Sequence, residues 1–259
     1  MARPMDINVG IKDFKRGTNI NDIKVPAKLR ERKKTGLSWF DEAFGGEGLV
    51  PSTIHMITGA PGAGKSTLLR QLGDSLTKSG YICLMNTGEE SLYQVKMASE
   101  RLKLKHACIG GQDKYVDDLV AYAKGLQKQN PTKQVFVLQD SLQTLDDGFY
   151  ANGTTGNTPV RCAAALTEWA KETFGIVMFI GQVNKDGEFS GKNTIKHMVD
   201  GHAELYFDTD KKSETFGKRL FEVSKNRWGC NGKTFIMGMC PTGLYEEGYF
   251  SKAQDTGNE

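Results

Sequence analysis

Apolar residues gather in two kinds of segment along this chain. Compact, almost wholly apolar runs occupy residues 53–58, 81–86, 135–139 and 176–181. Between them, apolar residues recur every three or four positions in longer stretches, at about 65–79, 91–103, 113–129 and 159–173. Near-continuous apolar strands are typical of a parallel sheet whose two faces are covered by helices. The pattern predicts an α/β fold with a mostly parallel central sheet flanked by helices.

The pattern changes after about residue 203. From there on, strand-like runs are joined by short turns, and they lie at 203–207, 219–224, 233–239 and, more weakly, 243–246. Short connections favour antiparallel pairing. These segments therefore predict antiparallel strands near the C-terminus that extend one edge of the sheet.

The two ends of the chain lack sustained periodicity. Residues 1–34 are predicted to form an extended or flexible lead-in, and residues 249–259 a polar tail. After the lead-in, apolar residues at helical spacing predict a short helix that ends at Gly45-Gly46. Residues 35–248 are thus expected to form one core domain, a length that can bury a large hydrophobic core.

Composition narrows the class of protein. With 38% hydrophobic and 25% charged residues, the chain is typical of globular proteins. It contains no apolar run long enough to span a membrane and no signal-like N-terminus, so we expect a cytoplasmic protein without a membrane partner. The five scattered cysteines form no C-x-x-C pair, which argues against a zinc site and a disulfide framework.

Charge is unevenly distributed. The net charge is only +3, but residues 1–36 hold ten Lys or Arg against four Asp or Glu, a local charge of +6 on a body of −3. A basic arm fits nucleic acid or an acidic neighbour. A solvated tail explains the same charge equally well.

Residues 59–66 read GAPGAGKS and stand between an apolar strand and a helix. This is the G-x-x-x-x-G-K-[ST] phosphate loop, in which glycines let backbone N–H groups point at phosphate oxygens and the helix dipole adds positive potential. The loop predicts binding of ATP with Mg²⁺, with Lys65 on the β- and γ-phosphates and Ser66 on the metal. The residues expected to hold the nucleotide are Gly59, Ala60, Pro61, Gly62, Ala63, Gly64, Lys65, Ser66 and Thr67.

Three polar residues follow other core strands. Asp140 ends the run 135–139 and is expected to hold Mg²⁺ together with Ser66, although a strand-ending aspartate can also cap a turn. Glu89 is the predicted group that polarises the attacking water, and its neighbour Glu90 is an alternative that can equally be a first-turn helix acid. Gln182 is predicted to sense the γ-phosphate, the alternative being a surface glutamine.

Two long polar stretches, 145–159 and 184–197, also follow core strands. Ligands bind at this edge of open α/β sheets, and loops of this length are usually functional. Later in the chain, Lys225-Asn226-Arg227-Trp228-Gly229 joins two cations to an aromatic residue. Lys225 and Arg227 are predicted to act on the γ-phosphate of a neighbouring subunit, whereas a plain basic surface turn is the alternative.

Together these residues resemble the ATPase core of RadA, also called Sms, a branch of the RecA-like motor proteins. The similar stretches are Thr35-Gly36-Leu37, GAPGAGKSTLL, TGEES, Asp140-Ser141-Leu142-Gln143-Thr144, GQVNKDG and, most discriminating, KNRWG. The resemblance covers about residues 35–244. It implies a RecA-like P-loop ATPase fold and assembly into a homo-oligomeric ring, with six subunits expected, or a filament.

The resemblance also implies a function. It implies ATP hydrolysis coupled to movement on single-stranded DNA in recombination or repair, with possible helicase or branch-migration activity. Under it, the two polar loops line a DNA channel, and residues 1–34 dock on the adjacent subunit. The expected DNA contacts are phosphate contacts by Arg161, Lys185, Lys192 and Lys196, and base stacking on Phe149, Tyr150 and Phe189.

The sequence departs from the family in three ways. RadA proteins carry a four-cysteine zinc module and a Lon-like domain that have no counterpart in this sequence, and Trp228 stands where they usually have Phe. Such a core fits a phage-type annealing or scaffold protein gated by nucleotide as well as it fits a DNA-dependent ATPase motor. A small-molecule kinase is a weaker alternative, because the sequence offers neither an acceptor pocket nor a lid.

Overall fold

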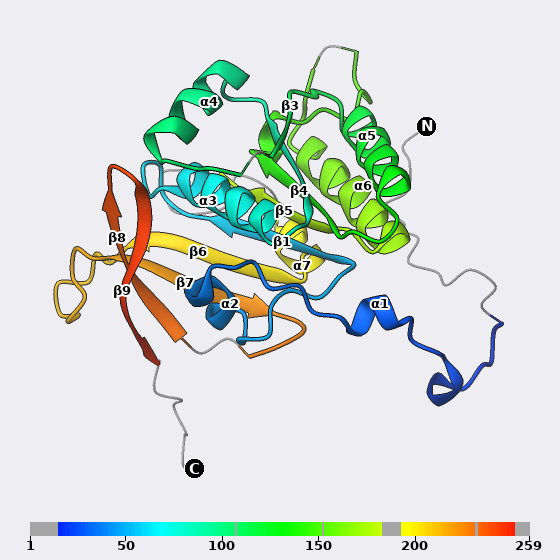
Figure 1. Cartoon of the computed structure of the whole chain (residues 1–259), viewed down its shortest axis with the longest axis horizontal. Coiled ribbons are helices and arrows are strands. Elements are labelled where there is room, and N and C mark those ends of the chain that lie inside the picture. Colours follow the sequence, from blue (N-terminus) through cyan, green and yellow to red (C-terminus); the bar gives the residue numbers. More distant parts are fainter. Residues whose placement is uncertain (1–14, 107, 152, 183–192, 231–232, 252–259) are drawn as a thin grey trace.

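The computed structural model describes residues 15–251, apart from 107, 152, 183–192 and 231–232 (Figure 1). The described strands form a nine-stranded sheet in the order β3-β2-β4-β5-β1-β6-β7-β8-β9. The strands are β1 (Thr53–Thr58), β2 (Ile82–Thr87), β3 (Ile109–Gly111), β4 (Val135–Asp140), β5 (Ile176–Ile180), β6 (Gly201–Phe207), β7 (Arg219–Asn226), β8 (Lys233–Cys240) and β9 (Gly243–Ser251). The α/β fold predicted from the apolar pattern is confirmed.

Helices cover both faces of the sheet, as Figure 1 shows. They are α1 (Ala27–Arg30), α2 (Ser38–Ala43), α3 (Lys65–Lys78), α4 (Leu92–Arg101), α5 (Val116–Gln129), α6 (Thr158–Thr173) and α7 (Asn193–Met198), with short 3₁₀ turns at Ile20–Asp22 and Leu142–Thr144. Helices α2 and α3 contribute to one buried cluster, and α5 and α6 to the other. Burial of these apolar faces supplies the main stabilisation of the domain.

The sheet changes direction at β6. Strands β3, β2, β4, β5, β1 and β6 are parallel to their neighbours, and β7, β8 and β9 follow in antiparallel pairs. The strand predicted at 203–207 corresponds to β6, which we expected to be antiparallel to its neighbours. It is antiparallel to β7 but parallel to β1. The weak strand at 243–246 is longer than predicted, since β9 extends to Ser251.

Several short elements were not predicted. Strand β3 is only three residues long and forms one edge of the sheet. Helix α7 begins at Asn193, within the stretch 184–197 that we expected to be a loop, and ends at Met198; residues 184–192 of that stretch lie outside the described residues. In the lead-in, α1 and the turn at Ile20–Asp22 bury none of their side chains. No helix in the described ranges is long and apolar enough to cross a membrane.

Candidate functional site

The phosphate loop connects β1 to α3, as the sequence predicted. Gly59, Gly62 and Gly64 all have positive φ angles. At Gly59 a Cβ atom would lie 1.9 Å from the carbonyl oxygen of Leu205, so this close approach to β6 requires glycine. Gly64 adopts the left-handed conformation at the N-cap of α3. The loop is therefore shaped by its glycines and opens onto the positive end of the α3 dipole.

Lys65 lies folded over this loop. Its Nζ donates hydrogen bonds to the carbonyl oxygens of Gly59 at 2.7 Å and Ala60 at 3.0 Å. Burial lowers the pKa of Lys65, and the nearby carboxylates of Asp140 and Glu89 oppose that shift. The ammonium group thus stands between the loop carbonyls and two acidic side chains, where phosphate oxygens would be strong acceptors.

Asp140 ends β4 beside the start of α3. Burial of its carboxylate raises the pKa of Asp140, a hydrogen bond from the Ser66 side chain lowers it, and the charge of Glu89 raises it further. The hydroxyl of Ser66 and this carboxylate are hard oxygen ligands in contact with each other. The pair fits Mg²⁺, which is usually held by one or two protein oxygens together with phosphate and water. Among the described residues, no group of three or more His, Cys, Asp or Glu forms a site for a protein-only metal.

The two neighbouring glutamates after β2 have different partners. Glu89 Oε1 accepts a hydrogen bond from Ser141 Oγ at 2.6 Å and another from Gln182 Nε2 at 2.5 Å. Glu90 instead forms an ion pair with the buried guanidinium of Arg70 on α3. Glu89 therefore lies where the ends of β2, β4 and β5 meet, while Glu90 ties β2 to the helix behind the phosphate loop.

A buried amide network supports this edge and was not predicted. Asn86 Nδ2 donates to Gln139 Oε1 at 2.8 Å, and Gln139 Nε2 donates to the carbonyl oxygen of Ser141 at 2.9 Å. The backbone N–H of Gln182 donates to Gln143 Oε1 at 3.3 Å. The bonds of Asn86 and Gln139 fix the positions of the strand ends, because buried amides that lose a partner cost free energy. The signal available in the sequence was an Asn and a Gln inside otherwise apolar strands.

Lys225 and Arg227 lie at the C-terminal end of β7, beside the start of β6. Lys225 Nζ donates to the carbonyl oxygens of Lys196 at 2.9 Å and His197 at 3.1 Å, at the C-terminal end of α7. Arg227 Nη1 lies 2.9 Å from Asp200 Oδ1. Asp200 is buried and also accepts the backbone N–H of Ile54 on β1. Within the chain the two cations thus brace α7 and its junction with β6.

The polar loop after β4 contains a compact aromatic cluster. Arg161 pairs with Asp147, with an Nη2–Oδ1 distance of 3.1 Å. Its guanidinium lies 5.0 Å from the ring centre of Phe149 and 5.5 Å from that of Tyr150. The pairing holds the pKa of Asp147 below its usual range. Arg161 is therefore engaged with an acid, while both aromatic rings remain partly exposed.

The other expected DNA-contact residues are only partly accounted for. Lys196 lies in α7, and its carbonyl oxygen receives the bond from Lys225. Lys185, Phe189 and Lys192 lie outside the described residues.

Comparison with known proteins finds relatives with similar sequences. The chain is 36% identical over 217 residues to the DNA repair protein RadA of Bacillus subtilis, covering 83% of this chain and 45% of that protein. It is 33% identical over 216 residues to RadA of Brucella abortus, covering 82% of this chain and 44% of that protein. The resemblance to RadA is confirmed. The chain spans less than half the length of these two RadA proteins.

Solved structures similar to the RadA-like core agree on the fold. One solved ATPase domain aligns with a TM-score of 0.69 at 16% identity, covering 81% of this chain and 89% of that one. A DnaB-like replicative helicase gives 0.67 at 17%, with coverages of 80% and 59%. A KaiC-like protein from Pyrococcus horikoshii gives 0.62 at 18%, with coverages of 83% and 98%. The predicted RecA-like P-loop ATPase fold is confirmed.

One family model also matches part of the chain. The viral superfamily 1 RNA helicase core domain matches residues 55–154, which include the phosphate loop, Glu89 and Asp140.

Proposed function

We propose that the chain is the ATP-hydrolysing core of an oligomeric DNA recombination or repair motor that acts on single-stranded DNA in the cytoplasm. The observation that carries this proposal is the meeting of the phosphate loop, Asp140 and the Glu89–Ser141–Gln182 cluster at one edge of the sheet. Phosphoryl transfer needs a phosphate cradle, a metal site and a group that orients the nucleophile, and this edge offers all three.

In the proposed site, the loop backbone and Lys65 hold the β- and γ-phosphates of ATP. Lys65 Nζ exchanges its bonds to the carbonyls of Gly59 and Ala60 for phosphate oxygens. Ser66 and Asp140 hold Mg²⁺, which neutralises charge on the phosphates. The positive end of α3 favours the anion further.

Glu89 acts as the water-orienting residue. Its Oε1 is fixed by Ser141 and Gln182, which leaves Oε2 to accept a hydrogen bond from water. Gln182 is proposed as the nucleotide sensor, because its side chain reaches Glu89 and its backbone continues into the stretch 183–192. A change at the γ-phosphate can thus pass through one side chain into the second polar loop.

Oligomerisation completes the site. Lys225 and Arg227 brace their own α7 in a single subunit, and we propose that they stabilise γ-phosphate charge on the neighbouring subunit, as an arginine finger does. Residues 1–34 are the proposed docking segment. Helix α1 and the turn at Ile20–Asp22 bury no side chains on their own body, which leaves those surfaces available to a neighbour.

Phe149 and Tyr150 are the proposed stacking surface for bases of single-stranded DNA. Arg161 lies against both rings and is bonded to Asp147, so it holds the aromatic pair in place as well as supplying charge. Lys185, Lys192, Lys196 and Phe189 are proposed as further contacts on the second loop.

The test is the rate of ATP hydrolysis with and without a single-stranded oligonucleotide, together with mass by light scattering. We expect DNA to raise turnover and nucleotide to favour the oligomer. Turnover that is unchanged by DNA would rule out the motor. Slow turnover together with efficient annealing of complementary strands would favour the nucleotide-gated annealing protein instead.

A further inference from the structure

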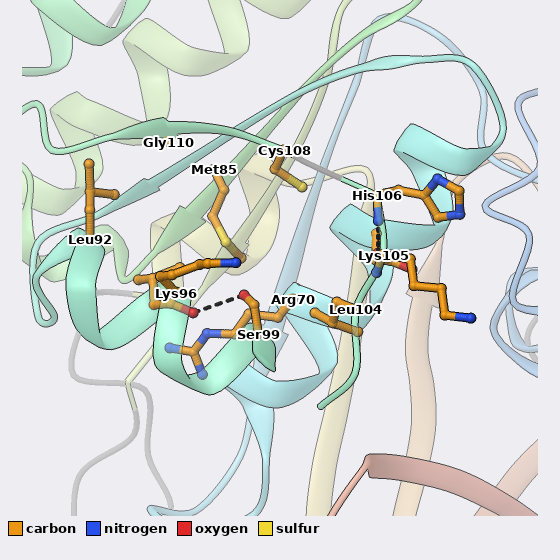
Figure 2. A pocket seen from close by; sticks show the side chains of 12 residues that line it. Arg70, Met85, Leu92, Lys96, Ser99, Leu104, Lys105, His106, Cys108 and Gly110 are labelled. Atoms are coloured by element: carbon orange, nitrogen blue, oxygen red, sulfur yellow. Dashed lines mark hydrogen bonds between the residues drawn. The ribbon is translucent and has the colours of Figure 1, made fainter. Parts of the chain in front are cut away.

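A cavity of about 340 Å³ lies between α4 and the edge of the sheet formed by β2 and β3. Figure 2 shows Met85, Leu92 and Leu104 around it, with the basic side chains of Lys96 and Lys105. Val95 also lines the wall. The cavity combines an apolar interior with cationic groups, and it is separate from the phosphate loop.

Helix α4 leaves apolar surface beside this cavity. None of its residues is buried, and the side chains of Tyr93 and Met97 are 85% and 68% exposed. Leu92 is exposed as well and also lines the cavity. Exposed apolar side chains that continue into a cavity are typical of a protein-binding surface.

The charge of the region indicates the kind of partner. Between residues 96 and 106 the chain carries Lys96, Arg101, Lys103 and Lys105 against the single acid Glu100. Asp74 on α3 also lines the cavity, where its Oδ1 accepts the backbone N–H groups of Lys105 and His106, at 2.7 and 2.6 Å, so the basic residues outnumber the acids here without being alone. The surface therefore favours an acidic ligand.

The chain's own N-terminal arm does not match this surface. Its described part, from residue 15 to residue 34, is strongly basic, so it would place like charges together. Nucleic acid matches the charge but not the cavity, because the apolar side chains of Met85, Val95 and Leu104 form walls that suit an aliphatic or aromatic side chain.

We propose that the α4 cavity is a docking site for an acidic peptide segment of a partner protein that carries a large apolar side chain. The apolar side chain enters the cavity, and the acidic residues lie against Lys105. Lys96 forms an ion pair with Glu100 at 3.2 Å, and the ligand's carboxylates replace that partner or share it. The site adjoins the catalytic edge, because Arg70 lines the cavity and forms the ion pair with Glu90. The proposal concerns binding and is independent of ATP hydrolysis.

The experiment measures fluorescence anisotropy of a fluorescein-labelled peptide, Gly-Asp-Glu-Asp-Asp-Leu-Phe, added to the full chain. We expect a dissociation constant of about 100 µM or tighter. Lys105→Glu should weaken binding about fivefold or more, and raised salt should do the same. Ser99→Leu, which narrows the cavity, should also weaken it about fivefold; the Ser99 hydroxyl bonds only its own helix at Val95. A peptide ending in Gly-Gly should bind poorly.

Lys211→Glu is the matched control. It makes the same charge change on an exposed position of the β6–β7 connection, and three strands separate β2 from β6. The affinity of this variant for the labelled peptide should stay within about twofold of that of the unmodified chain. Urea denaturation of each variant confirms that it is folded.

Four results would overturn the proposal. The first is no binding of the peptide at all, and the second is an affinity that Lys105→Glu and Ser99→Leu leave unchanged. Another is that Lys105→Glu weakens binding of a labelled single-stranded oligonucleotide but leaves peptide binding unchanged. That result would make the surface a nucleic-acid site. The last is a change of mass in Lys105→Glu by light scattering, which would make it a contact between copies of the chain.

Discussion

The two halves of the sheet use their polar side chains differently. In the half from β3 to β1, the strands β2, β4, β5 and β1 are almost wholly buried. Polar residues that follow β2, β4 and β5 contact one another, as Glu89 does with Ser141 and Gln182. In the half from β6 to β9, the cations Lys225 and Arg227 hold α7 and Asp200 of their own chain. The first half brings the candidate nucleotide-binding residues together within one chain, whereas the cations of the second half contact only their own chain here, and we propose that they act on the nucleotide of a neighbouring copy.

The largest effect is expected at the phosphate loop. Lys65→Ala removes the cation that the phosphate loop would offer to phosphate, and turnover should fall about 10³-fold. Phosphate release measures it. Lys78→Ala, at the far end of the same helix, is the control and should retain activity. Turnover within about tenfold of the unmodified chain would show that this half does not hold the nucleotide.

Lys225→Ala tests the other half. If the side chain acts on a neighbour's γ-phosphate, turnover should fall about 10²-fold while the affinity for a fluorescent ATP analogue stays within about twofold. The variant also loses the bonds to the α7 carbonyls, so urea denaturation must show that it is folded. An equal loss of affinity and turnover would contradict the assignment.

The seam between the halves holds two buried histidines, His55 on β1 and His202 on β6. Burial lowers the pKa of each to about 4, below the usual 6.5, so both are neutral in the native protein. The unfolded chain binds protons below pH 6.5 and the native chain does not, so stability falls as pH falls from about 6.5 toward 4. Each histidine should lower the free energy of unfolding by about 2 kcal/mol when the pH falls from 7 to 5.

Urea denaturation at the two pH values measures this effect, and His202→Asn should remove about half of the difference. His202 bonds Thr58 through Nε2 and Ser224 through Nδ1, at 2.7 and 2.8 Å, so the variant also tests the link between β1 and β6. The same acid dependence in the variant would contradict the assignment.

The smallest effect is expected at Ser141. Ser141→Ala removes one of the two hydrogen bonds that hold Glu89, and turnover should fall about fivefold, close to 1 kcal/mol. Ser79→Ala, whose hydroxyl bonds only a carbonyl within the end of α3, is the control. No change in turnover would mean that Gln182 alone suffices to hold Glu89.

The sequence was most informative for the first half. Buried parallel strands read as apolar runs, and a polar residue at the end of each run, such as Asp140 or Gln182, lies at the common edge by topology. The phosphate loop can be identified from the sequence because its chemistry requires particular residue types at a fixed spacing. What could not be derived was which side chains meet, such as Ser141 with Glu89 or Arg161 with Asp147.

The elements that were missed are short or depend on tertiary contacts. Strand β3 has three residues and two of them are glycine, so no apolar run marks it. Helix α7 has six residues, and its last turn is held by Lys225 from β7. The parallel pairing of β6 with β1 brings Gly59 close to Leu205 and Gly201 close to His55, where a Cβ would collide, and this tertiary contact is not visible in the hydrophobic pattern.

The central claim is that the nucleotide edge of one copy is completed by the cations of the next, and mixing two inactive variants tests it most directly. Glu89→Gln lacks the water-orienting carboxylate but keeps Lys225, and Lys225→Ala keeps the intact nucleotide edge. In an equal mixture, about one junction in four pairs an intact edge with an intact cation. We expect about a quarter of the unmodified turnover to return on mixing. Turnover no higher than the average of the two variants alone would contradict the account.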